Sequence, residues 1–126
     1  MKSIYIAAAV AIVLVAGSVA SSIYVKNVAE KLEKRTEAVL EEIKQDNYEG
    51  AIEAANQLDR QIERSKTLLC AVVDHKDIYE IKRSLGELLC YLDKEEKPDS
   101  LAHCAAIVAV TEKISDNALP YIFNIL

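Results

Sequence analysis

Glycine, proline and aromatic residues are scarce in this 126-residue sequence, and tryptophan is absent. The three glycines are scattered at Gly17, Gly50 and Gly86, which excludes a glycine-rich phosphate-binding loop. Neither the C-x-x-C nor the H-E-x-x-H spacing occurs, so no metal-binding motif is recognisable. The composition is rich in alanine, leucine, isoleucine, glutamate and lysine, which is typical of an all-α protein.

Charge is absent from one region and abundant in the rest. Residues 3–25 carry no charged side chain, whereas all twenty acidic residues and fourteen of the fifteen basic residues come after them. The region from Lys26 onward is therefore acidic, and it contains no stripe of basic residues interleaved with aromatics. Phosphate binding needs such a cluster of lysine and arginine, so we expect no nucleic-acid partner.

The uncharged stretch SIYIAAAVAIVLVAGSVASSIYV is long enough to cross a membrane. Its 23 residues would form a helix of roughly 34 Å, against a bilayer core of about 30 Å. Tyr5 and Tyr24 would then lie near the two membrane interfaces, where tyrosine is enriched. The sequence predicts an N-terminal transmembrane anchor over residues 1–26.

A cleaved signal peptide is the alternative, because Ser18-Val19-Ala20 resembles a cleavage site. Apolar residues resume at Ile23-Tyr24-Val25, which favours an uncleaved anchor. Positive charge is denser after the segment than before it, which favours a cytoplasmic C-terminal domain. A single-pass anchor with a two-residue head more commonly exports the domain on its C-terminal side. We therefore expect a single-pass protein of the cell membrane, with residues 27–126 extracytoplasmic.

The rest of the chain is periodic at helical spacing. One face of a helix that continues out of the anchor carries Val28, Leu32, Val39 and Ile43. After a break near Asp46-Asn47, a seam with alternating spacings of three and four runs through Tyr48, Ala51, Ala55, Leu58, Ile62, Ser65, Leu69 and Val72. A third helix carries Ile78, Ile81, Leu85, Leu88 and Leu92. These patterns predict an acidic antiparallel bundle of about four helices, and the seam would serve a homo-oligomer equally well.

The fourth segment, SLAHCAAIVAVTEKI, is apolar on nearly every side, which predicts the central, buried helix of the bundle. The chain then ends in a strongly apolar tail after Pro120. Such a tail is expected to lie on its own bundle, on the membrane surface or on a partner. We take its large side chains as candidate interaction residues: Tyr121, Ile122, Phe123, Ile125 and Leu126.

The three cysteines, Cys70, Cys90 and Cys104, each lie within apolar sequence. An odd number leaves at least one of them unpaired within a monomer. We interpret them as small buried residues rather than as reactive thiols.

The stretch VVDHKDIYE brings Asp74, His75, Asp77 and Glu80 together. As a metal site it would offer carboxylates and one histidine, but a second histidine is missing nearby. As a helix junction, Asp77 would be the N-cap of the third helix with Glu80 three residues on. His75 would cap the carbonyl groups of the preceding helix. We favour capping, and we expect no catalytic residue, metal or cofactor.

Several segments together resemble a known family: the start MKS, the helix NYEGAIEAANQLDRQIE, the block DHKDIYEIKRSLGELLCYL and the end NIL. They are similar to small single-anchor membrane proteins of spore-forming Gram-positive bacteria, known as domain of unknown function 4363. The most specific part is Asp74-His75, followed by Asp77-Ile78 and Glu80-Ile81. The sequence departs from the family pattern by lacking tryptophan, with Tyr48 where an aromatic is usual. The resemblance implies a membrane-anchored helical domain without established activity, and a specific role for His75 if the Asp-His pair is a family feature.

No nucleophile has a base at a recognisable spacing, so we do not expect an enzyme. We expect a protein–protein interaction or accessory module of the cell envelope, with a membrane or envelope protein as partner. The alternative is an extracytoplasmic helical-bundle sensor that binds a small ligand or ion, with His75 or His103 lining its pocket.

Overall fold

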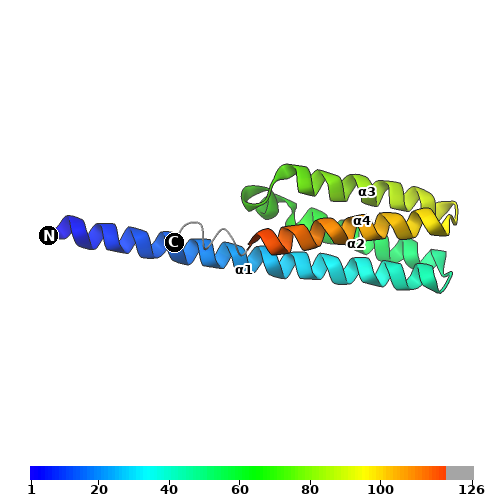
Figure 1. Cartoon of the computed structure of the whole chain (residues 1–126), viewed down its shortest axis with the longest axis horizontal. Helices are drawn as coiled ribbons and strands as arrows, with labels where there is room; N and C mark the ends of the chain where they lie inside the picture. The colour runs from blue at the N-terminus through cyan, green and yellow to red at the C-terminus, as the bar shows by residue number, and fades with distance from the viewer. Residues whose placement is uncertain (119–126) are drawn as a thin grey trace.

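A computed structural model describes residues 1–118, and these residues form four helices without a strand. They are α1 (Lys2–Lys44), α2 (Tyr48–Val72), α3 (His75–Asp93) and α4 (Lys97–Ala118). The predicted all-α fold, a long apolar N-terminal helix followed by an antiparallel bundle, is confirmed (Figure 1). The predicted interaction residues of the C-terminal tail lie outside the described residues.

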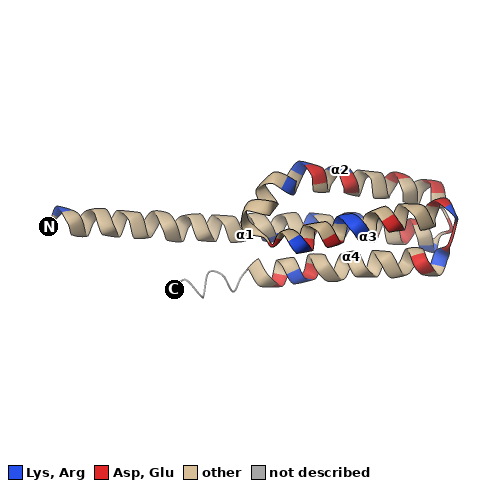
Figure 2. Ribbon diagram, turned by 90° about the horizontal axis from the view of Figure 1, so that it is seen from above, with Lys and Arg blue, Asp and Glu red and all other residues tan. Residues whose placement is uncertain are grey.

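The helices run up and down in turn around a shared core. α1 packs against α2 and α4, and α3 packs against the same two helices, whereas the backbones of the diagonal pairs do not approach one another closely. α1 is much longer than its neighbours, so its N-terminal part extends beyond the bundle (Figures 1 and 2). We call the end from which it extends the proximal end, and the opposite end, with the α1–α2 and α3–α4 loops, the distal end.

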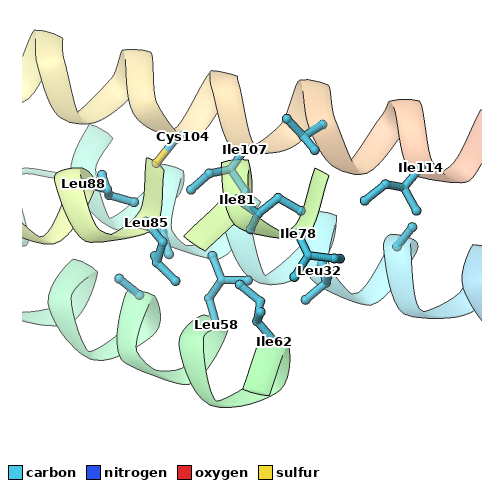
Figure 3. Packing of buried hydrophobic residues seen from close by; sticks show 14 of the residues in the cluster. Leu32, Leu58, Ile62, Ile78, Ile81, Leu85, Leu88, Cys104, Ile107 and Ile114 are labelled. Carbon is cyan, nitrogen blue, oxygen red and sulfur yellow. The ribbon is translucent and has the colours of Figure 1, made fainter. Parts of the chain in front are cut away.

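The core coincides closely with the predicted seams. Of the eight seam positions of α2, the six inner ones are buried, while Tyr48 is half-buried and Val72 is exposed at the helix ends. All five predicted positions of α3 are buried. Their side chains meet those of α1 and α4 in one cluster, shown in Figure 3 with Leu32, Leu58, Ile81 and Ile107 among its members. A spacing of three and four places apolar residues on one stripe, and each helix buries that stripe against its two neighbours.

The predicted break at Asp46-Asn47 is confirmed by the local geometry. Asp46 adopts a positive φ of 59°, which ends α1. The Asn47 side chain then accepts a hydrogen bond from the Gly50 amide at 3.1 Å and caps α2. A Cβ at Gly50 would collide with the Asn47 side chain, so a larger residue at this position would push the capping side chain aside.

The prediction that α4 is the central helix is wrong. α4 has two neighbours, like every other helix of the described bundle, and its outer side is exposed. The outward positions are the alanines Ala102, Ala105, Ala106 and Ala109, whereas Cys104, Ile107 and Val110 are buried. An alanine exposes only one methyl group, so a helix can be apolar all round and still lie at the surface.

α1 passes from a free part to a packed part without a break. Residues 2–17 are exposed, and the buried stripe begins with Ser22, Val25 and Val28. Ser22 and Val25 belong to the predicted anchor, so the apolar segment and the bundle overlap by about two turns of helix. The residues that would form the signal-peptide cleavage site lie inside this continuous helix.

Candidate functional site

The junction between α2 and α3 lies at the proximal end, next to α1 (Figure 1). Asp74, not Asp77, is the N-cap of α3: its carboxylate accepts a hydrogen bond from the Lys76 amide at 3.0 Å. The predicted capping residue is therefore wrong by three positions. The cap falls on the first aspartate, and α3 gains His75, Lys76 and Asp77 as its first turn.

The expectation that His75 caps α2 is also wrong, because His75 is the first residue of α3. The last turn of α2 ends instead with the Val73 amide donating to the Leu69 carbonyl at 2.7 Å. The His75 side chain is exposed on the first turn of α3. The position thus has no structural role in ending the preceding helix.

Asp77 connects α3 to α4. Asp77 is buried, and its carboxylate accepts a hydrogen bond from the Lys113 ammonium group at 3.1 Å. This hydrogen bond and the negative charge of Asp77 raise the pKa of Lys113, with smaller contributions from Glu80 and Asp74. A buried carboxylate is costly without a partner, so Lys113 and the positive end of the α3 dipole stabilise Asp77 where it lies.

The predicted turn therefore brings together three carboxylates around one lysine. Asp74 caps α3, Asp77 binds Lys113, and Glu80 lies exposed one turn further on. Within residues 1–118, no three side chains of histidine, cysteine, aspartate and glutamate converge in a way that could hold a metal ion. The arrangement acts electrostatically, by fixing the end of α4 to the beginning of α3.

A cleft with a volume of about 570 Å³ opens beside this ion pair. One wall is the face of α1 with Val13, Gly17, Ser18 and Ser21, and the others are the α2–α3 junction and the last turns of α4. Asp77 and Lys113 are part of its lining, together with apolar residues such as Val73 and Ile114. The cleft is thus mixed in character, with apolar walls and one ion pair.

Sequence reasoning missed this cleft. It exists because the small residues Gly17, Ser18, Ser21 and Ser22 fall on one face of α1 at the level of the α4 end. A Cβ at Gly17 would meet no atom within 4 Å, which shows how open this face is. The sequence did contain one signal for the cleft, the spacing of these small residues within an apolar segment. The opposite wall of the cleft, however, is formed by α4, and only the tertiary structure places α4 there.

The two histidines do not line the cleft, contrary to the expectation for a ligand sensor. His103 lies on α4 toward the distal end and is held by two acceptors. Its Nε2 is 2.6 Å from a Glu87 carboxylate oxygen, and its Nδ1 is 2.9 Å from the Asp99 carbonyl oxygen. The bond to the Asp99 carbonyl raises the pKa of His103, burial opposes this, and Glu87 raises it further. Both acceptors are satisfied at once by the protonated imidazolium.

The cysteines differ in their environments. Cys104 is buried, and burial raises the pKa of its thiol to about 12, which makes it unreactive at neutral pH. Cys70 is half-buried and Cys90 is exposed. The prediction of buried cysteines therefore holds for Cys104 and is wrong for Cys90, which points outward from α3.

Comparison with known proteins identifies the bundle. No curated protein and no solved structure matches the chain significantly. A family model does match, over residues 19–125. Its first residue lies where α1 begins to pack on the other helices, so the family pattern covers the bundle and leaves out the projecting part of α1. The chain belongs to the family described as a domain of unknown function, DUF4363.

Proposed function

We propose that this protein is a membrane-anchored, non-enzymatic module of the cell envelope that binds another membrane or envelope protein. The observation that carries the proposal is the form of α1. It is long and apolar enough to cross a membrane, and its residues 2–17 project from the bundle with their side chains exposed. Exposed apolar surface of this extent is avoided in water, so a bilayer is its natural environment.

A rigid connection between anchor and bundle supports a role in contacting neighbours. Because α1 is one unbroken helix, the bundle is held in a fixed position relative to the anchor and is not joined to it by a flexible linker. This placement limits its partners to proteins of the membrane or its immediate surroundings. We also propose that the bundle lies on the extracytoplasmic side of the membrane.

The outer side of α4 supports a protein partner. From Ser100 to Thr111 the helix carries no Lys, Arg, Asp or Glu, while α2, α3 and the part of α1 after residue 25 all carry charged residues (Figure 2). Ala102, Ala105 and Ala109 present a flat surface with little side-chain entropy to lose on binding. The apolar tail, with Tyr121, Ile122 and Phe123, begins just beyond the C-terminal end of this helix.

The test is affinity purification of the tagged protein from its native membranes in mild detergent, followed by mass spectrometry. We expect a stoichiometric membrane or envelope protein. Replacing Tyr121, Ile122 and Phe123 by serine, or Ala105 by glutamate, should reduce its recovery while the helix content stays unchanged. The matched control is Ala38→Glu, which adds the same charge to an exposed position of α1. Recovery of the bare protein, without a partner, would contradict the proposal.

The cleft supports a second candidate function, an extracytoplasmic sensor of a small ligand or ion. Its volume of about 570 Å³ is in the range of ligand pockets. A ligand that binds the folded state raises the melting temperature by mass action, so a thermal-shift screen with metabolites and metal ions tests this function. A true ligand should stabilise the parent and Gly86→Leu, which lies on an open surface, but not Gly17→Leu, which fills the cleft. If the ligand raises the melting temperature of Gly17→Leu as much as that of Gly86→Leu, it binds outside the cleft.

A further inference from the structure

We propose that the proximal end of the bundle is itself immersed in the membrane interface, so that lipid contacts the bundle as well as the anchor. The proposal rests on the proposed membrane anchoring of α1 and adds a second lipid-binding surface. This surface consists of four side chains from three helices: Ile23 on α1, Leu68 and Val72 on α2, and Tyr79 on α3.

Large exposed apolar side chains of the bundle gather at its proximal end. Among residues 18–118, the large hydrophobic residues that are exposed are Ile23 (55%), Leu68 (60%), Val72 (42%) and Tyr79 (62%). Leu68 and Val72 form the last turn of α2, and Tyr79 comes just after the first turn of α3. All four therefore lie at the proximal end, within about two helical turns of the point where α1 leaves the bundle. A bundle end surrounded by water would not be expected to collect them.

The free part of α1 is shorter than the hydrocarbon core of a membrane. The free part of α1, Lys2 to Gly17, measures roughly 24 Å, which is about 6 Å less than a hydrocarbon core of about 30 Å. Residues 18–25 make up the difference, but Ser22 and Val25 are already buried against the rest of the bundle. Spanning the core with α1 therefore draws the proximal end toward the lipid. The shortfall of about 6 Å is similar to the depth to which interfacial helices are buried, about 5–10 Å.

The charged residues at this end define how deep it lies. The α2–α3 junction carries Asp74 and Lys76, both exposed, so this turn belongs among lipid headgroups and not in hydrocarbon. Asp77 is buried and paired with Lys113, whose long side chain can extend toward the headgroups. Leu68 and Val72 lie beside this charged turn. If the turn lies among the headgroups, their side chains reach the boundary between headgroups and acyl chains.

The experiment uses the absence of tryptophan from the chain. Single variants of the full chain, Leu68→Trp and Tyr79→Trp, are reconstituted in vesicles of phosphatidylcholine, with or without bromine atoms on the acyl chains. Bromine quenches tryptophan only when it is close. Ile12→Trp reports on the anchor, and Asp93→Trp, exposed at the distal end of α3, reports on water.

We expect Leu68→Trp and Tyr79→Trp to lose at least about half the emission that Ile12→Trp loses in brominated vesicles, since the interface borders the acyl chains. Asp93→Trp should lose none and should be quenched by aqueous iodide instead. If Ile12→Trp is quenched but Leu68→Trp and Tyr79→Trp behave like Asp93→Trp, the bundle stands clear of the lipid and the inference is overturned, with the bilayer thinning around a short anchor. If Ile12→Trp is not quenched either, the anchor proposal fails and the inference fails with it.

Discussion

The proximal and distal ends of this molecule differ in chemistry although the same four helices form both. At the distal end the two loops carry charged residues (Figure 2). Lys97 forms an ion pair with Asp46 at 3.0 Å between them. At the proximal end four large apolar side chains are exposed beside the charged α2–α3 turn, a cleft opens between helices, and the apolar part of α1 continues outward. The hydrophobic core is continuous between the two ends. The contrast therefore lies in the exposed side chains at each end and not in how the helices pack. A distal end in water and a proximal end in lipid, as we propose, account for it.

The most drastic way to break this contrast is to delete residues 2–17. We expect most of the shortened chain to move from the membrane fraction to the soluble fraction, because the exposed apolar part of α1 is removed and the proximal surface of the bundle alone is small. Fractionation followed by an alkaline wash measures this, and circular dichroism should show that the bundle remains helical. Retention of the shortened chain on membranes would show that the anchor is not the main attachment.

A pair of identical substitutions in α1 sharpens the comparison. Ile43 is fully buried near the distal end, whereas Ile12 projects from the proximal end with its side chain exposed. We expect Ile43→Ala to lower the free energy of unfolding by about 2–5 kcal/mol through lost burial and a cavity. Ile12→Ala should change it by less than about 0.5 kcal/mol. Chemical denaturation in detergent measures both, and equal losses would mean that residues 2–17 also pack within the protein.

The ion pairs at the two ends provide a smaller contrast. Asp77 is buried although its partner Lys113 is exposed, whereas Asp46 is exposed and its partner Lys97 is half-buried. Double-mutant cycles with alanine should therefore give a larger coupling for Asp77 and Lys113 than for Asp46 and Lys97, because water screens the exposed pair. Each effect should be smaller than that of Ile43→Ala. Equal couplings would contradict the assignment of Asp77 as the residue that fixes α4 to α3.

The smallest expected effect is a dependence of the stability on pH, caused by His103 in the distal half of the bundle. Because the folded-state pKa of His103 is raised, its bonds to Glu87 and Asp99 stabilise the fold fully below the unfolded pKa of about 6.5. This stabilisation is lost as the pH rises through the folded pKa. Thermal melts of the parent against His103→Gln should therefore converge above that pH and differ below it. A constant difference at every pH would show that His103 contributes by packing on Tyr91, whose ring centre is 5.0 Å away, and not by charge.

Much of the fold was predictable because its signals are local. The seams of α2 and α3 alternate at three and four residues, and a helix with that pattern has one apolar stripe to bury. The break at Asp46-Asn47 was equally predictable, since the Asn47 side chain caps α2 by bonding to Gly50, only three residues further on. The family resemblance is confirmed over residues 19–125.

The candidate site was less predictable, because its properties depend on which helices are neighbours. Asp74 and Asp77 are both good capping residues, and the sequence offered no way to choose between them. The choice becomes visible once Lys113 on α4 is found to engage Asp77 from across the bundle. The central place predicted for α4 is wrong for a related reason: its pattern is apolar all round, but exposed alanines cost little, so apolarity does not require burial on every side.

The sequence by itself determined the helical character, the positions of the breaks, the apolar segment and the acidic remainder, since each depends on residues close together along the chain. Only the tertiary structure decided where the apolar segment stops being free, because Ser22 and Val25 become buried through contact with the bundle and not through their own chemistry. It likewise decided that Leu68, Val72 and Tyr79 share one end with the emerging helix. That grouping depends on antiparallel packing, which brings together residues more than forty positions apart in the sequence.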